Sequence, residues 1–158
     1  MKPRVYVETT IPSFYYEQRP EASMVARRDW TREWWDAYRM NYDPVSSIAV
    51  IEELQEGEHP AKHDALALLA SLELLVINDT IIEIVDTYIE HRIMPRDPRG
   101  DALHLAIASY HRCQFLLTWN CAHLANANKI EHIRHINNML GLYVPALVTP
   151  MELSEEEV

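Results

Sequence analysis

Two short apolar stretches of this chain end on polar side chains whose oxygen atoms can bind a metal ion. The first, RVYVETT, reaches Glu8 and then Thr9, and the second, FLLTWN, reaches Thr118 and then Asn120. The alternating, β-branched residues before Glu8 are typical of a strand. Ligands of open α/β sheets bind beyond the carboxyl ends of the strands. We therefore expect both stretches to end at one metal site, although a single acidic strand end can also be a turn residue or a helix N-cap.

A third candidate, Asp101, stands at the start of the apolar helix pattern DALHLAIASYH. Asp97 and Pro98 already provide an N-cap and a first helical residue, so Asp101 is not needed as the cap. The helix is apolar over most of its circumference and is expected to be largely buried. A carboxylate at its start then needs hydrogen bonds, a cation or a metal ion. The alternative is a surface acid that interacts favourably with the helix dipole.

Glu52 and Glu53 are adjacent in the helix pattern IAVIEELQE, so they point in different directions. Glu53 lies at helical spacing from Ala49 and Val50, near the apolar side, whereas the neighbours of Glu52 on its own face are polar. We therefore predict that Glu53 belongs to the site, although on this argument alone both can be plain surface charges.

The elements that must position these residues alternate between helices and strands. Strands are predicted at 4–8, 74–78, 115–119 and 143–150, and helices at 22–40, 48–56, 61–72, 80–92, 98–112 and 122–140. The segment DPVSS is expected to break the first long helix and to cap the next through Ser46 or Ser47. This alternation predicts an α/β fold with a central parallel sheet flanked by helices. We expect one domain over residues 1–150 and a solvated acidic tail over residues 151–158.

Composition and charge exclude several classes of protein. The net charge of −10 argues against a broad basic surface for nucleic acid, but not against local binding of one phosphate by a metal ion and a few arginines. No apolar run approaches the roughly 20 residues that span a bilayer, and residues 1–20 lack the apolar segment of a signal peptide. The two cysteines lack the spacing of a zinc or redox pair. We therefore expect a cytoplasmic protein that does not enter a membrane.

Eight histidines raise the question of a zinc site. His104 and His111 share one edge of a predicted helix, and His132 and His135 are three residues apart. Neither pair has a Cys or acidic partner at ligand spacing along the chain. We therefore expect structural or surface roles for these four.

Several residues near the predicted strand ends can contact a substrate. Arg96 and Arg99 flank the helix that begins near Asp101 and are expected to contact RNA phosphates, although both can also be ordinary loop arginines. His123 follows the second strand end by three residues and can reach a phosphate or pack in the loop. Thr9 and Thr118, which lie next to the strand-end candidates, are predicted to bind substrate as well.

Four segments, taken in order, resemble the PIN-domain family: VYVETTIPSF, AVIEEL, GDALHLAIA and LLTWNCAHLAN. The resemblance covers roughly residues 4–150 and looks closest to the PIN proteins grouped with VapC-type toxins. Each segment is short, but four in the family's order and spacing are a fairly specific signal. The resemblance implies a PIN-like domain, in which helices wrap a parallel sheet and three or four clustered acidic residues bind Mg²⁺ or Mn²⁺ and cleave RNA.

The family's acidic positions can be matched residue by residue. Its first strand usually ends in Asp, and here Glu8 keeps the charge on a longer side chain. Its glutamate before a leucine matches Glu53, and its helix-start aspartate matches Asp101. Its fourth acid, two residues after a Thr or Ser, falls on Asn120, whose amide oxygen can coordinate a hard cation or hold a water. The resemblance thus implies catalytic roles for all four residues, with one metal ion bound by Glu8, Glu53 and Asp101.

The resemblance also implies a function and partners. We expect a metal-dependent endoribonuclease, the toxin of a type II toxin–antitoxin pair, that forms a homodimer and binds a small antitoxin protein. The tryptophan-rich helix at 22–40 is the expected partner surface, because three tryptophans exceed what one short face of a small core usually needs. One alternative is a degenerate PIN domain that binds RNA or protein without cleaving it, and another is a metal-dependent phosphohydrolase acting on a small molecule.

Overall fold

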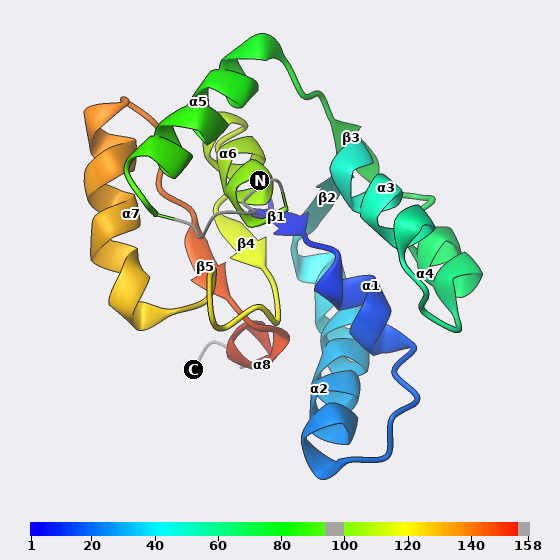
Figure 1. Cartoon of the computed structure of the whole chain (residues 1–158). Coiled ribbons are helices and arrows are strands. Elements are labelled where there is room, and N and C mark those ends of the chain that lie inside the picture. The colour runs from blue at the N-terminus through cyan, green and yellow to red at the C-terminus, as the bar shows by residue number, and fades with distance from the viewer. Residues whose placement is uncertain (94–99, 155–158) are drawn as a thin grey trace.

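The computed structural model describes residues 1–93 and 100–154 (Figure 1). Within them, one sheet of five parallel strands has the order β3-β2-β1-β4-β5. The strands are β1 (Arg4–Val7), β2 (Asp43–Ser47), β3 (Glu73–Leu75), β4 (Phe115–Leu117) and β5 (Ala146–Val148). The helices are α1 (Thr10–Tyr15), α2 (Ala22–Glu33), α3 (Ile48–Glu56), α4 (Lys62–Leu68), α5 (Asp79–Glu90), α6 (Asp101–Tyr110), α7 (Ala127–Met139) and α8 (Pro150–Leu153). A π-helical turn, η1 (Trp34–Tyr38), and a 3₁₀ turn, η2 (Arg39–Asn41), follow α2.

The chain winds outward from β1 in two directions. The connections from β1 through β2 to β3 contain α1 to α4, and those from β3 through β4 to β5 contain α5 to α7. Figure 1 shows these two groups of helices on opposite sides of the sheet. Right-handed crossovers produce this arrangement, because the direction of winding reverses after β3. The strand order therefore has its switch point between β1 and β4, where open α/β sheets bind ligands.

The core is built around β1 and α6. Val5, Tyr6 and Val7 of β1 are fully buried, as expected for a central strand with neighbours on both sides. Helix α6 is buried over most of its length, from Ala102 to Ser109. The predicted α/β fold with a parallel sheet and the predicted burial of this helix are therefore confirmed. Within the described part of the chain, no helix is both long and apolar enough to cross a membrane.

The segment DPVSS does separate the first long helical segment from α3, as predicted, but it is also a strand, β2, which was not predicted. Its serines are buried and satisfied by neighbours rather than by water. Ser46 Oγ donates to the carbonyl of Val7 at 3.0 Å, and Ser47 Oγ lies 2.8 Å from the hydroxyl of Tyr6. Ser47 does occupy the N-cap position of α3, but its side chain makes no capping hydrogen bond. Polar residues were thus accommodated in the sheet because the adjacent strand supplied their partners.

The structure differs from two further expectations, for the tryptophan-rich helix and for the C-terminal tail. The predicted helix 22–40 is divided into α2, η1 and η2, and Trp34 and Trp35 are buried in the chain's own core. Of the three tryptophans expected at a partner surface, only Trp30 is exposed, at 36%. The predicted tail begins inside α8, and Leu153 and Ser154 are buried rather than solvated. Residues 155–158 lie outside the described part of the chain.

Candidate metal centre

The switch point between β1 and β4 brings together acidic side chains from distant parts of the sequence. Glu8 directly follows β1, and its N–H donates to the carbonyl of Leu117 at the end of β4, at 3.2 Å. Glu53 comes from α3, and His104 comes from α6. One ligand atom from each of Glu8, Glu53 and His104 lies within 4.8 Å of the other two. We call these three residues the metal cluster.

Glu8 is a buried carboxylate held at one oxygen. It is 4% exposed. Its Oε1 accepts hydrogen bonds from the backbone N–H of Thr10 at 3.0 Å, from the hydroxyl of Thr10 and from the hydroxyl of Thr118 at 2.8 Å. Burial raises the pKa of Glu8, although the charge of His104 and the threonine hydrogen bonds oppose the increase. The second oxygen, Oε2, accepts no hydrogen bond from the residues that the structure describes, so it is free to bind a cation.

Glu53, not Glu52, faces the cluster. Its Oε2 accepts a hydrogen bond from Thr9 Oγ1 at 2.7 Å, and its Oε1 lies 2.7 Å from Nε2 of His104. Burial by itself raises the pKa of Glu53, but the hydrogen bonds and charge of His104, with the bond from Thr9, lower it overall. Glu52 is exposed. The predicted helical phase is confirmed.

His104 is the residue that sequence reasoning missed. It is fully buried, and its acidic partner comes from α3 rather than from a nearby position in the chain. Its Nδ1 lies 2.7 Å from the hydroxyl of Tyr6. Burial lowers the pKa of His104, but the charges of Glu53, Glu8 and Asp101 raise it overall. The available signal was its position three residues after Asp101, which places both side chains on one face of α6.

Asp101 and Asn120 form a pair beside the metal cluster. Asn120 Nδ2 donates to Asp101 Oδ1 at 3.0 Å, and Asn120 Oδ1 accepts from the backbone N–H of His123 at 3.1 Å. The backbone N–H of Asn120 donates to Thr118 Oγ1 at 2.9 Å. Asn120 therefore orients Asp101 through Nδ2, and its amide oxygen already accepts one hydrogen bond. A role of this oxygen toward a metal ion or its water stays a prediction. Asp101 lies outside the group of three ligand atoms that are mutually within 4.8 Å.

The residues predicted to bind substrate have mixed outcomes. Thr118 is fully buried and its hydroxyl donates to Glu8, so it orients a site carboxylate and cannot contact a substrate. Thr9 is partly exposed and orients Glu53. His123 is partly buried, and its Nδ1 has no hydrogen-bond partner among the described residues. Substrate contact by Thr9 and His123 stays a prediction. Arg96 and Arg99 lie outside the described part of the chain.

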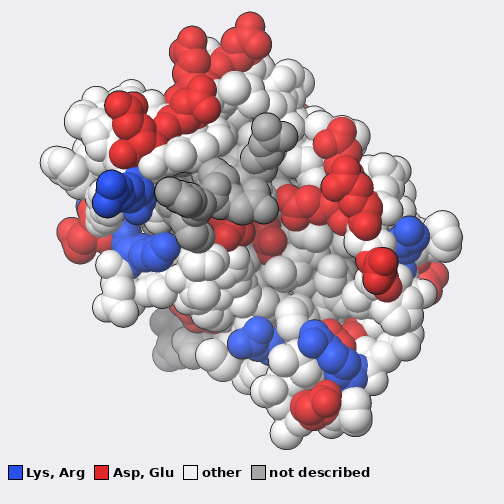
Figure 2. Space-filling model, in the orientation of Figure 1, with Lys and Arg blue, Asp and Glu red and all other residues white. Residues whose placement is uncertain are grey.

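The charges at this site are poorly balanced. Among the described residues, no Lys or Arg forms an ion pair with Glu8 or Glu53, and the only cationic partner is His104. Acidic side chains also form several patches on the face shown in Figure 2, with basic side chains in a few small groups. Buried carboxylates require compensation. Carboxylate oxygens are the ligands that Mg²⁺ and Mn²⁺ prefer, so the residues present fit such an ion.

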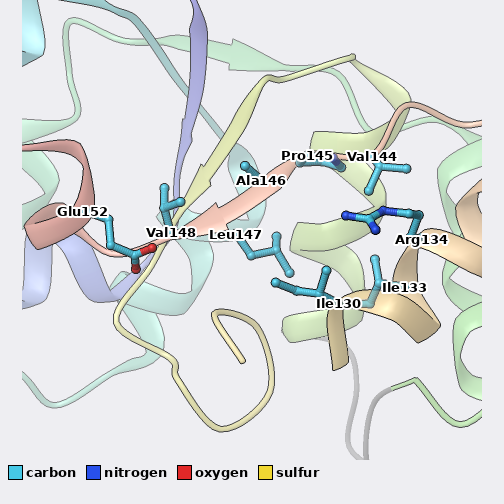
Figure 3. Close-up of a pocket in the computed structure, with 9 residues that line it drawn as sticks. All are labelled: Ile130, Ile133, Arg134, Val144, Pro145, Ala146, Leu147, Val148 and Glu152. Atoms are coloured by element: carbon cyan, nitrogen blue, oxygen red, sulfur yellow. The ribbon is translucent and has the colours of Figure 1, made fainter. Parts of the chain in front are cut away.

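A separate pocket of about 370 Å³ lies between α7 and β5 and contains none of the site residues (Figure 3). Leu147 of β5 points toward Ile130 and Ile133 of α7. Arg134 and Glu152 are its charged members. The lining is mainly aliphatic and offers no group of converging ligands, so we place the chemistry at the metal cluster and not in this pocket.

Replacing Thr118 with valine should destabilise the protein by about 1–3 kcal/mol. Valine has the same shape, but it leaves Glu8 without one donor and the N–H of Asn120 without its acceptor. The free energy of unfolding, measured by urea denaturation, tests this. Thr80→Val is the matched control, because Thr80 is exposed and its change should stay within about 0.5 kcal/mol. Equal effects of the two substitutions would contradict the orienting role of Thr118.

The metal-free protein should lose stability as the pH rises above neutrality. The pKa of His104 is raised above its usual 6.5. The stability that its protonated form contributes is therefore fully present below pH 6.5 and is lost as the pH rises through the raised pKa. The pKa of Glu8 is raised above 4.5, so its ionisation removes stability in the same direction. The pKa of Glu53 is lowered, so its contribution is present above pH 4.5 and is lost below it.

Thermal unfolding in EDTA should therefore show the highest midpoint between about pH 4.5 and 6.5, nearer the lower value because ionisation of Glu8 already removes stability above pH 4.5. His104→Gln removes the titrating imidazole and should flatten the decline above this range. A wild-type midpoint that stays level or rises from pH 6.5 upward would show that these groups do not control stability.

No family model matches this chain, and the searches of curated proteins and of solved structures gave no significant match.

Proposed function

We propose that this chain is a metal-dependent endoribonuclease of the PIN type. The observation that carries the proposal is the convergence of Glu8, Glu53 and His104 within 4.8 Å at the switch point of the sheet. Each of the four segments that resemble the PIN family contributes to this one region, although they are far apart in the sequence. Converging carboxylates without a Lys or Arg partner in the described residues are a reason to expect a divalent cation there.

Glu8 and Glu53 would hold Mg²⁺ or Mn²⁺, and Asp101 would complete the site from its position beside the metal cluster. A bound ion of this kind neutralises the charge of a phosphodiester and makes water a better nucleophile. The neighbouring side chains fix the carboxylates before any ligand arrives: Thr118 donates to Glu8, and Asn120 donates to Asp101. Such outer partners typically support metal affinity and activity, because they reduce the motion of the ligands.

Arg27 supports a role in binding a phosphate. Its guanidinium lies 5.5 Å from the ring centre of Trp119 and 5.6 Å from that of Phe14. Trp119 immediately precedes Asn120, so Arg27 places a cation beside the end of β4. It forms no ion pair within residues 1–93 and 100–154. Its charge is therefore available to bind a phosphate of an RNA backbone. The net negative charge of the protein would otherwise repel the RNA.

The direct test is cleavage of structured RNA by the purified chain in Mn²⁺, with EDTA and Glu8→Gln as controls. We expect products with a 5′-phosphate and a 3′-hydroxyl from the wild type only. RNA binding without cleavage would favour the degenerate PIN domain, and hydrolysis of small phosphate esters alone would favour the phosphohydrolase. Either result would replace the nuclease proposal.

As a VapC-type toxin, the protein would act on cytoplasmic RNA, form a homodimer and be inhibited by a small antitoxin protein. Induced expression should then arrest bacterial growth for the wild type and not for Glu53→Gln. Light scattering of the purified chain measures the dimer separately. Normal growth at equal expression of the wild type would contradict the toxin role without touching the nuclease proposal.

A further inference from the structure

We propose that His104 is a metal ligand. The site is then a mixed nitrogen–oxygen centre that prefers Mn²⁺, and the divalent ions that follow it in the first transition row, to Mg²⁺. This inference rests on the metal centre of the proposed function, but it does not require RNA to be the substrate. Carboxylate oxygens suit both Mg²⁺ and Mn²⁺, so the nitrogen donor is what would discriminate strongly against Mg²⁺.

The spacing of the ligand atoms suits one ion. Nε2 of His104 is 2.7 Å from Oε1 of Glu53, and the three groups of the metal cluster are mutually within 4.8 Å. Two atoms bound to one ion, each at about 2.2 Å, are separated by at most about 4.4 Å. The cluster therefore needs movements of no more than a few tenths of an ångström to share an ion.

The imidazole is held with one nitrogen toward the carboxylates. Its other nitrogen, Nδ1, lies 2.7 Å from the hydroxyl of Tyr6, which in turn lies 2.8 Å from Ser47 Oγ. His104, Tyr6 and Ser47 are fully buried, so the ring cannot turn toward solvent. A metal-binding histidine typically uses its second nitrogen in such a hydrogen bond, which fixes both its tautomer and its orientation.

Charge favours an ion over the hydrogen bond alone. Two carboxylates of the cluster are paired with a single imidazole, and the described residues add no Lys or Arg. A divalent ion between the three side chains compensates both carboxylates at once. In that arrangement the imidazole of His104 is neutral and binds the ion through nitrogen, instead of compensating the carboxylates as a protonated cation.

The nitrogen donor determines which ions bind well. Mg²⁺ strongly prefers oxygen ligands and retains its water, whereas imidazole suits first-row transition ions. For a site of fixed ligands, affinity generally increases from Mn²⁺ to Co²⁺. We therefore expect affinity to increase in the order Mg²⁺, Mn²⁺, Co²⁺.

Pulsed electron paramagnetic resonance of the full chain loaded with Mn²⁺ tests the ligand directly. The wild type should show ¹⁴N coupling from a coordinated imidazole, and protein made with ¹⁵N-histidine should show ¹⁵N coupling instead. His104→Gln should lose the nitrogen signal, and His123→Gln, at the other histidine beside the site, should retain it. By calorimetry, His104→Gln should lose most of the preference for Mn²⁺ over Mg²⁺, because the nitrogen donor is removed.

Mn²⁺ binding to the wild type without nitrogen coupling would overturn the proposal, and so would a signal that His123→Gln removes. If His104→Gln does not fold, the wild-type and His123→Gln spectra still decide between these outcomes. RNA cleavage is measured separately on the same samples. Nitrogen coupling without cleavage would establish His104 as a metal ligand and refute the nuclease. Cleavage in Mn²⁺ without nitrogen coupling would support the nuclease and refute His104 as a ligand.

Discussion

Glu53→Gln should lower Mn²⁺-dependent RNA cleavage by roughly 100-fold or more. Loss of a residue that only hydrogen-bonds to a metal ligand typically costs about 10- to 100-fold, and this substitution removes a charged ligand itself. The amide has nearly the shape of the carboxylate, so the core around α3 should be preserved. The lost charge is the one that pairs with His104 and faces Glu8. Initial rates of RNA cleavage at saturating Mn²⁺ measure the effect, and circular dichroism verifies the fold.

Glu52→Gln is the matched control for this substitution. It makes the same chemical change one residue earlier on α3, at an exposed position outside the metal cluster. Its cleavage rate should stay within about twofold of the wild type, because its side chain is solvated and supplies no ligand atom to the metal cluster. If both variants cleave RNA as well as the wild type, the carboxylate of Glu53 has no part in the reaction.

Asn120→Asp should destabilise the metal-free protein and make it more dependent on metal. The substitution removes the donor that holds Asp101 at 3.0 Å and places two carboxylates side by side. Loss of the hydrogen bond and the new repulsion should cost about 1–2 kcal/mol. At 2–4 °C per kcal/mol for a domain of this size, the unfolding midpoint in EDTA should fall by about 2–8 °C. Added Mn²⁺ should recover the loss, because the extra charge increases affinity for a divalent cation.

Asn126→Asp separates this effect from a general consequence of adding charge. Asn126 is the N-cap of α7, and its side chain accepts a hydrogen bond from the N–H of Asn128. Aspartate is an equally good N-cap and interacts favourably with the helix dipole, which offsets the loss of the exposed hydrogen bond from Asn126 Nδ2 to the carbonyl of Ala122 at 3.0 Å. Its midpoint in EDTA should therefore stay within about 2 °C of the wild type. A fall of equal size in both variants, or a fall in Asn120→Asp that Mn²⁺ does not reverse, would place Asn120 outside the metal centre.

Local patterns were sufficient wherever a residue's role depends on its own element. The helical phase of IAVIEELQE separates Glu53 from Glu52, because side chains one residue apart on a helix point about 100° away from each other. The apolar circumference of DALHLAIAS predicts a buried α6. The recurrence of apolar strands between helices predicts a parallel sheet, since parallel strands need crossover connections. From these, the position of Glu8 at a strand end and of Asp101 at a helix start follows.

Roles that depend on a partner from another element were not readable from the sequence. Ser46 and Ser47 look like turn and capping residues, but DPVSS pairs with β1 and β3 as strand β2, and β1 supplies the hydrogen-bond partners of both serine side chains. His104 looks like one of eight unremarkable histidines until α3 brings Glu53 to its Nε2. The hydrogen bond that the amide of Asn120 donates to Asp101 is likewise not visible in the sequence. Side-chain periodicity records which face of an element is apolar, but a hydrogen bond requires a distance and a direction to one particular atom. Only the packing of α3 and α6 against the ends of β1 and β4 determined those.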